Sequence, residues 1–475
     1  MFVSAVVLFN SDQVVSGESI LALTRDLCKP ATGVVSQGND ELFSRIGEEL
    51  PLTLHRYASG SQQNGWVVPK RWRVERATIS HNGTLLYDGA SHTLAVAQLS
   101  KSFKGTVDFN ELAAHVITDE KRPDAIIYHC AWQYRPWDID WVFSIPFGEF
   151  SAFPTGGRFE IDLETIAEDG EMLVGECFVA GTTPQTIVFN SHVCHPHQAN
   201  DGMAGVALLI RLFQWINARA GNRYSYRLIL APEHLGTVFY LGDRTRDELE
   251  LMVSGIFAEM PGVAAPLKIT SSFLGDQPID ILFAYLFGAC GEKTVSVPWR
   301  KGAGNDETVW EAPGYEVPFV ELTRCIDQFE PYPEYHSSLD TAESLDSEYV
   351  ERFYLILKQA VEILEKNRTY QRRFDGLPCL SHPDYNLYCE RPDPAVNKGL
   401  PGDSEKWGGL LDSLMRYFNG RTSTLDIALR HDLSFHLLWD YLRKFEEKGL
   451  VTSEPAVIRR HPVVSRNENS LTQGR

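Results

Sequence analysis

The chain has 475 residues, more than the roughly 250 to 300 residues that one hydrophobic core usually supports, so we expect two or three domains. Hydrophobic residues make up 43% of the chain and aromatic residues 11%, which is typical of a globular protein rather than a disordered one. The formal net charge of -19 disfavours binding to nucleic acids or anionic membranes, because both are themselves negatively charged.

The eight cysteines are spread over the whole chain, without the paired spacing of a thiolate metal site or the density of a disulfide-rich domain. Residues 1–12 lack the basic region and cleavage site of a secretion signal, and we expect them to form a strand or an irregular start. These features favour a cytoplasmic location. No run of about 18 apolar residues occurs, so we expect no membrane-spanning segment.

The first third of the chain is predicted to contain a helix followed by many short strands. Residues 39–52 carry apolar side chains at helical spacing, and residues 65–80 alternate as in an extended strand. Residues 86–150 are dense in aromatic and alternating apolar residues, with one clear helix at 110–117. We therefore expect a small β-rich insert at 86–151.

The middle of the chain is predicted to form a layered α/β domain. Between residues 185 and 260, three apolar strand-like segments alternate with amphipathic helical ones, and a long amphipathic helix follows at 346–367. Such alternation is typical of βαβ units in a parallel or mixed sheet whose two faces are covered by helices. We expect this α/β domain to comprise residues 20–85 and 152–375.

The C-terminal part resembles a winged helix-turn-helix. After a loop rich in proline and cysteine, residues 405–455 are predicted to form three helices and an extended segment, and we place this domain at 400–462. Residues 403–460 contain nine Lys or Arg and nine Asp or Glu, with no basic stripe. This balance disfavours DNA binding and favours a contact with a protein partner or a second copy of the chain.

Histidines and carboxylates follow three successive strands predicted in the α/β domain. Ligands collect where parallel strands end, and histidine nitrogens and carboxylate oxygens are common zinc ligands. The pattern therefore predicts a metal site. The residues concerned are His192 and Asp201 after the first strand, Glu233 and His234 after the second, Glu259 after the third, and His336 in a turn-like loop before the long helix.

The contexts of these residues resemble those of the zinc aminopeptidases of the M28 family. Asp201 and Gly205 form a D-x-x-x-G pattern, Glu233 begins the residue pair after the second strand, and His336 stands in HSSLDT. The resemblance is closer to a bacterial aminopeptidase-like subfamily, DUF4910- or DUF2172-like, with a small β-rich insert and a C-terminal winged helix. It implies a zinc exopeptidase-like fold, in which a mixed, mainly parallel sheet has helices on both faces.

The resemblance also implies a chemistry. Glu233 would be the general base that takes a proton from a zinc-activated water, and this water would attack the carbonyl of a peptide or peptide-like amide. The implied substrate is a small peptide or a peptide-like molecule, and the implied cofactor is one or two zinc ions. The implied ligands are His192, Asp201, His234, Glu259 and His336.

Three positions depart from the family pattern and leave the number of metal ions open. His234 stands where the family has a glutamate ligand, Glu259 where it has an aspartate, and Cys194 where an aspartate orients the first histidine. Histidine and glutamate both bind zinc, but a neutral thiol does not hold an imidazole as a carboxylate does. His195 could supplement or replace His192. The further candidates for the pocket or for orienting a ligand are Cys194, His195, Asp306 and Asp340.

Three functions are compatible with the sequence. The first is a metal-dependent hydrolase of aminopeptidase type, and the second is an amide hydrolase that works in the biosynthesis of a polysaccharide or another natural product. The third is a catalytically inactive binding or regulatory protein, which the substitutions at Cys194 and His234 motivate. Aromatic residues of the insert could form a substrate-recognition wall or the core of the insert. They are Trp132, Tyr134, Trp137 and Trp141.

Overall fold

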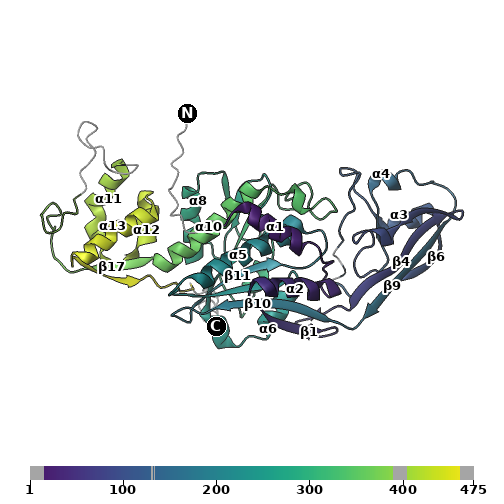
Figure 1. Cartoon of the computed structure of the whole chain (residues 1–475), viewed down its shortest axis with the longest axis horizontal. Coiled ribbons are helices and arrows are strands. Elements are labelled where there is room, and N and C mark those ends of the chain that lie inside the picture. The colour runs from purple at the N-terminus through teal and green to yellow at the C-terminus, as the bar shows by residue number, and fades with distance from the viewer. Residues whose placement is uncertain (1–14, 130–131, 133, 389–403, 461–475) are drawn as a thin grey trace, which may run out of the picture. The chain divides into compact units, whose positions relative to one another are not determined.

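The computed structural model describes residues 15–129, 132, 134–388 and 404–460 (Figure 1). Among these residues, one compact unit comprises 15–275 and 295–354, and the other comprises 276–294 with the described part of 355–462. The strand or irregular start expected at residues 1–12 lies outside the described residues.

The larger unit is built on an eight-stranded sheet. Its order is β1 (Thr53–Ala58), β10 (Glu171–Val179), β12 (Ser225–Ala231), β11 (Thr186–His192), β13 (Met252–Ala258), β16 (Phe319–Arg324), β14 (Leu267–Thr270) and β15 (Thr294–Val297). The four strands β12, β11, β13 and β16 pair in parallel, whereas β1, β10 and β14 pair antiparallel to their neighbours. The sheet is therefore mixed, with its parallel strands at the centre.

The central strands are apolar along their whole length because helices cover both faces of the sheet. Every residue of β11 and β13 is buried. Adjacent residues of β10 point to opposite faces: Gly175 lies against Phe43 of α2 (Gln37–Glu49), and Val174 lies against Gly236 of α6 (Leu235–Gly242). Helices α1 (Gly17–Leu27) and α5 (Ala204–Ala218) pack with each other, and α5 and α2 pack together. This arrangement confirms the predicted α/β fold class.

A second sheet in the same unit is fully antiparallel. Its order is β5 (Thr84–Asp88), β4 (Arg71–His81), β9 (Phe159–Glu168) and β6 (Phe103–Val107). The cluster behind it is rich in aromatic residues, among them Trp141, which is 3% exposed. The boundaries expected for the insert, 86–151, stay a prediction, and this sheet also contains strands that precede and follow that range.

Short elements complete the larger unit. They are α3 (Phe109–Ala114), α4 (Phe147–Phe150), α7 (Arg246–Leu251), α9 (Glu307–Trp310), the strands β2 (Gln62–Gln63), β3 (Trp66–Val67), β7 (Val116–Ile117) and β8 (Phe143–Ser144), the 3-10 helices Gly89–Ser91 and Ala342–Ser344, and the first part of α10 (Ser347–Lys366).

The smaller unit combines helices with a three-stranded antiparallel sheet. The sheet has the order β18 (Asn419–Ser423), β17 (Arg368–Arg372) and β19 (Val451–Pro455). Its helices are α8 (Pro278–Ala289), the end of α10, α11 (Ser404–Tyr417), α12 (Thr424–His431) and α13 (Phe435–Glu447). The winged helix-turn-helix at 400–462 stays a prediction, and residues 400–403, 461 and 462 of that range lie outside the described residues.

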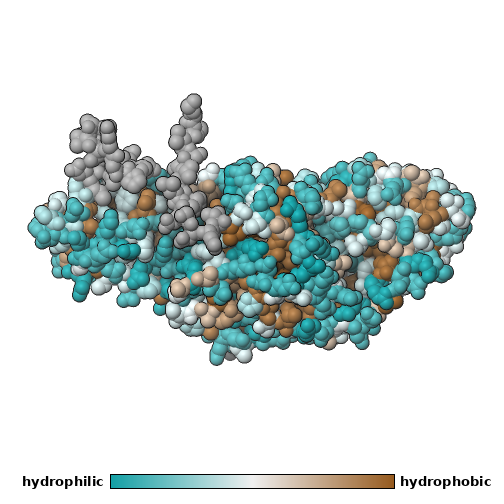
Figure 2. Space-filling view, viewed as in Figure 1, coloured by the Kyte–Doolittle hydropathy of each residue, from teal (hydrophilic) through white to brown (hydrophobic). Residues whose placement is uncertain are grey.

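Hydrophilic residues cover most of the face seen in Figure 2, in keeping with the high charge of the chain. No described helix is both long enough and apolar enough to span a membrane.

Candidate metal centre

The predicted site residues follow the carboxyl ends of three neighbouring parallel strands. β11 ends at His192, which lies opposite Ala231 at the end of β12, and β13 runs alongside β11 up to Ala258. Glu233 lies two residues after the end of β12, and Glu259 directly follows β13. Polar side chains from segments that are far apart in the sequence therefore lie close together at the carboxyl ends of the parallel strands.

Three candidate side chains form one group, in which His195 and Asp201 are buried and His336 is partly buried. Nε2 of His195 and Nε2 of His336 each lie 3.2 Å from Oδ2 of Asp201, and one ligand atom from each residue lies within 4.8 Å of the other two. His195 and Asp201 are 2% and 5% exposed. Two imidazoles and one carboxylate with room for a fourth ligand are a common set at a catalytic zinc. We call His195, Asp201 and His336 the first group.

The turn that carries Asp201 is fixed by a buried carboxylate. Asp201 lies in an irregular π-helical turn (Ala199–Met203) just before α5. The carboxylate of Asp340 accepts the backbone N–H groups of Asn200 at 2.9 Å and Asp201 at 3.2 Å, and it accepts the hydroxyl of Tyr332 at 2.9 Å. Burial raises the pKa of Asp340 to about 7, and the nearby Asp201 carboxylate adds to this. Asp340 therefore positions Asp201.

The two histidines of the first group are held from outside. Nδ1 of His195 lies 2.8 Å from the carbonyl oxygen of Pro196, which leaves Nε2 facing Asp201, as is usual for a metal-ligating histidine. The ring of Tyr128 stacks on His195 at 3.9 Å, and its backbone N–H donates to the carbonyl of His336 at 2.8 Å. Tyr335 stacks on His336 at 3.9 Å.

The charges of the first group are strongly coupled. Burial by itself raises the pKa of Asp201, but His336 and His195 outweigh burial and hold this pKa well below its ordinary value. Burial likewise disfavours protonation of His336, yet Asp201 raises the pKa of His336 above its ordinary value. A cation bound among these side chains would compensate the buried carboxylate in the same way as protonated histidine does. The donor set therefore fits a zinc ion.

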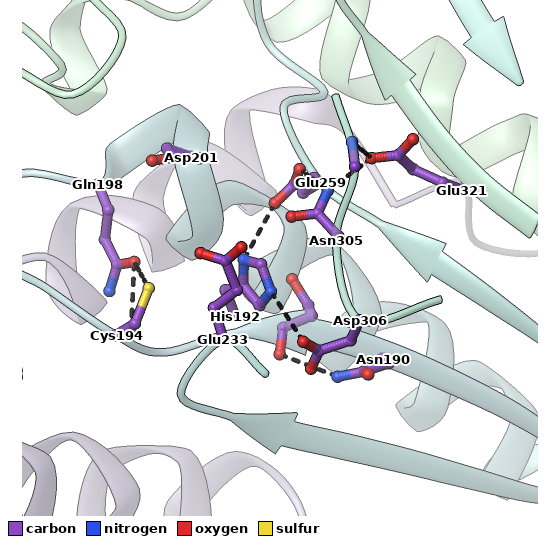
Figure 3. A network of polar contacts seen from close by, with 12 residues as sticks. Asn190, His192, Cys194, Gln198, Asp201, Glu233, Glu259, Asn305, Asp306 and Glu321 are labelled. Atoms are coloured by element: carbon purple, nitrogen blue, oxygen red, sulfur yellow. Dashed lines mark hydrogen bonds and ion pairs between the residues drawn. The ribbon is translucent and has the colours of Figure 1, made fainter. Parts of the chain in front are cut away.

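His192 belongs to a second group, with Cys194 and Glu233. One ligand atom from each of these residues lies within 4.8 Å of the others. Nδ1 of His192 lies 3.4 Å from Oε2 of Glu259, and Nε2 lies 3.8 Å from Oδ1 of Asp306 (Figure 3). Burial opposes protonation of His192, but these two carboxylates hold its pKa well above the ordinary value.

Glu259 contacts His192 and a buried amide. Its side chain is fully buried, and it accepts a short hydrogen bond from Nδ2 of Asn305. The same amide nitrogen lies 2.6 Å from Oε1 of Glu321, which also accepts the N–H of Gly304 at 2.8 Å. Burial raises the pKa of Glu259 to about 7. Sequence reasoning missed Asn305 and Glu321, although Asn305 directly precedes Asp306, a predicted pocket residue.

His234 lies in neither group. It precedes α6 with a φ of 50°, a strained backbone conformation for a residue with a side chain, and such strain often marks functional sites. Its N–H donates to Oδ1 of Asp306 at 2.6 Å, and its Nδ1 lies 3.4 Å from Oε1 of Glu233. The ring lies 6.3 Å from Trp66 and 6.1 Å from Tyr134, measured between centroids. His234 therefore sits in an aromatic wall beside Glu233.

The predicted aromatic wall is only partly at this place. Tyr134 lies beside His234, whereas Trp132 packs on His129 at 4.9 Å and Trp141 lies in the core behind the second sheet. Trp137 is 73% exposed. Trp66 was not predicted as part of the site, because a single tryptophan in a strand carries no signal of its own.

Solved structures show which known proteins share this fold. A crystal structure from Clostridium acetobutylicum, named provisionally as a peptidase, matches with a TM-score of 0.76 and 23% identity, over 92% of this chain and 96% of that chain. The zinc aminopeptidase BSAP from Bacillus subtilis matches with a TM-score of 0.54 and 13% identity, over 74% of this chain and 95% of that chain. The larger unit therefore has an aminopeptidase-like fold.

The family is defined by the sequence itself. Residues 21–367 match the family described as a domain of unknown function, DUF4910, and the chain belongs to this family. A protein from Clostridium acetobutylicum is 26% identical over 359 residues, which are 75% of this chain and 80% of that protein. It is named provisionally as a polysaccharide biosynthesis protein with an aminopeptidase-like domain. These findings confirm the predicted resemblance to the DUF4910 family and to the zinc aminopeptidases, whereas the winged helix stays a prediction.

Proposed function

We propose that the chain is a zinc-dependent hydrolase of aminopeptidase type, with one zinc ion bound by His195, Asp201 and His336. The observation that carries this proposal is the first group itself, in which three ligand atoms lie within 4.8 Å of one another. Asp201 and His336 were expected as ligands from the sequence. His195 takes the place expected for His192, because its Nε2 faces Asp201 whereas the ring of His192 lies between Glu259 and Asp306.

Glu233 is the proposed general base. Its side chain is 26% exposed, so it reaches the solvent-accessible side of the site, and its carboxylate lies close to His192 and His234. A zinc ion, when bound, polarises the substrate carbonyl and makes the attacking water more acidic. Glu233 accepts the proton of this water and passes it to the leaving nitrogen, so that an amide becomes an acid and an amine. Trp66, Tyr134 and His234 form the wall against which the substrate lies.

A peptide-type substrate is supported by the aminopeptidase-like fold. The name of the Clostridium acetobutylicum relative favours a second candidate, hydrolysis of an amide in polysaccharide biosynthesis. Both reactions use the same residues, because both cleave a carbonyl–nitrogen bond. A cytoplasmic location, and a homo-oligomer or protein partner bound through the predicted winged helix, stay predictions.

The test compares the wild-type protein with Glu233→Gln, and Glu171→Gln at an exposed position of β10 serves as the control. Release of amine is measured on a panel of aminoacyl amides, dipeptides and N-acetylated amino sugars. We expect Glu233→Gln to lose activity by about 100- to 10,000-fold while it keeps its zinc, since a general base contributes on that order. Equal activity in Glu233→Gln and wild type would contradict the role of Glu233. A zinc-loaded wild type that cleaves no amide in the panel would contradict the proposed substrate class.

A further inference from the structure

The second group consists of side chains that bind soft divalent metals. His192 and Cys194 are 2% and 4% exposed, and Glu233 lies with them in a group whose ligand atoms are within 4.8 Å of one another. An imidazole, a thiolate and a carboxylate are all zinc ligands, and the thiolate favours Zn²⁺ or Cd²⁺ over Mg²⁺ or Ca²⁺. Sequence resemblance assigns no ligand role to Cys194.

The ring of His192 is held between two buried carboxylates. Its Nδ1 faces Oε2 of the buried Glu259 at 3.4 Å, and a carboxylate in this position commonly fixes a metal-bound histidine. Its Nε2 is buried without a hydrogen-bond partner and lies 3.8 Å from Oδ1 of Asp306. The ring is therefore fixed beside Cys194 and Glu233, and one of its nitrogens belongs to their group.

Cys194 is held only weakly by its neighbours. Its Sγ lies 3.5 Å from Oε1 of Gln198, and its backbone N–H lies 3.4 Å from the same oxygen (Figure 3). Metal binding at Sγ therefore displaces one weak contact. The thiol loses its proton to solvent when the sulfur–metal bond forms, and neither the sulfur nor the metal changes its oxidation state.

The second group shares Glu233 with the proposed reaction. In a site where two metals act together, one carboxylate usually bridges both ions, but Asp201 is grouped with His195 and His336 and not with His192 and Cys194. An ion bound in the second group would instead bind the carboxylate of Glu233, which is the proposed acceptor of the proton from the attacking water.

We propose that His192, Cys194 and Glu233 form a second, inhibitory metal site, at which excess Zn²⁺ or Cd²⁺ binds and removes Glu233 from catalysis. The inhibition rests on the proposed function, since it requires Glu233 to act as the base. The binding of the second ion does not rest on it.

The test titrates the zinc-loaded full-length protein with Cd²⁺ and follows both the bound cadmium and the ultraviolet cadmium–thiolate band. The variants Cys194→Ser and Cys194→Ala are compared with Cys177→Ser, which replaces another buried cysteine, on β10. We expect about one additional cadmium and a thiolate band in wild type and Cys177→Ser, and neither in the Cys194 variants. Circular dichroism melts identify which Cys194 variant remains folded, and the comparison uses that variant. If neither variant remains folded, the comparison is replaced by a measurement on the wild type. It asks whether Cd²⁺ protects Cys194 from an alkylating reagent, as the proposed site requires.

Inhibition is measured in the same proteins as the ratio of rates at low and at excess zinc. We expect the zinc concentration for half inhibition to rise at least about 10-fold in the Cys194 variants. Even the loss of a residue that only supports a metal ligand usually lowers metal affinity by that factor. A thiolate band that persists without Cys194, or is absent from wild type, would overturn the site. A Cys194-dependent band without inhibition of an active enzyme would overturn its inhibitory role. A Cys194-dependent band in a protein without hydrolytic activity would support the site while it contradicts the proposed function.

Discussion

His192 and His195 are separated by two residues and face different partners. After His192 the chain leaves β11, and the Nδ1 of His195 turns to the carbonyl of Pro196, so that its Nε2 faces Asp201. His192 remains in the strand and lies between Glu259 and Asp306. At the residue scale, the direction of each ring and the carboxylate opposite it decide which histidine belongs to which metal group.

Asp340 supports the first group without belonging to it, and this support is testable. Asp340→Asn keeps the size of the side chain but replaces one acceptor oxygen with a donor group. The carboxylate accepts hydrogen bonds from the N–H groups of Asn200 and Asp201, so the amide of the variant leaves one of these donors without an acceptor. We expect zinc affinity to fall about 10- to 100-fold, as for other residues that orient metal ligands. Competition with a chromophoric chelator measures the affinity, and the exposed Glu343→Gln is the control. Unchanged affinity would show that the turn keeps its shape without the carboxylate.

At the scale of elements, the position of α5 depends on a glycine. An added Cβ at Gly205 would lie 2.6 Å from the carbonyl oxygen of Ala258 in β13 and 2.8 Å from Oγ of Ser191. The glycine of the D-x-x-x-G pattern therefore lets the helix after Asp201 approach the end of the neighbouring strand. This contact explains in physical terms why a glycine follows Asp201 at this spacing beside the proposed metal site.

Two glycine substitutions separate this contact from general helix propensity. We expect Gly205→Ala to lower the free energy of unfolding by about 1–3 kcal/mol, because the added methyl group overpacks α5 against backbone. At Gly47 of α2 no atom lies within 4 Å of an added Cβ, so we expect Gly47→Ala to be neutral or to stabilise by up to about 1 kcal/mol. Urea unfolding measures both. Equal effects of the two substitutions would contradict the close approach of α5 and β13.

The edge of the large sheet contains a buried ion pair with a pH-dependent contribution. Glu176 of β10 lies 2.8 Å from Nη1 of Arg227 on β12 and 2.8 Å from Nε2 of His55 on β1. Burial alone would raise the pKa of Glu176, but His55 and Arg227 outweigh it and hold this pKa below its ordinary value of 4.5. A carboxylate whose pKa is lowered by folding stabilises the folded state above that ordinary value, and the stabilisation is lost as the pH falls through the folded pKa.

We therefore expect Glu176→Gln to destabilise the protein at pH 7 by about 1–3 kcal/mol, the usual scale for a hydrogen-bonded charged group. The difference from wild type should shrink when unfolding is measured at progressively lower pH below 4.5. The exposed Glu171→Gln on the same strand is the control, and we expect little change from it. A difference that stays constant with pH would contradict the stabilising role of the Glu176 carboxylate.

At the scale of the whole molecule, local pattern and tertiary arrangement were not equally predictable. The apolar strands and amphipathic helices between residues 185 and 260 were predictable, because burial on both faces leaves continuous apolar runs. The hydrogen bond to Glu259 beside His192 was not predictable, since it comes from Asn305 in a distant loop. The inclusion of α8 in the smaller unit was not predictable either. The hydroxyl oxygen of Tyr285 on this helix accepts a hydrogen bond from the backbone N–H of Phe435 at 2.6 Å, although the two residues are far apart in the sequence.

The central claim is that one zinc ion is bound by His195, Asp201 and His336. Its most direct test is the zinc content of wild type, His195→Ala and His192→Ala by elemental analysis, after excess metal has been removed. We predict about one zinc per chain in wild type and in His192→Ala, and none in His195→Ala, because a catalytic zinc needs about three protein ligands. Zinc that is kept in His195→Ala and lost in His192→Ala, or is absent from wild type, would contradict the account.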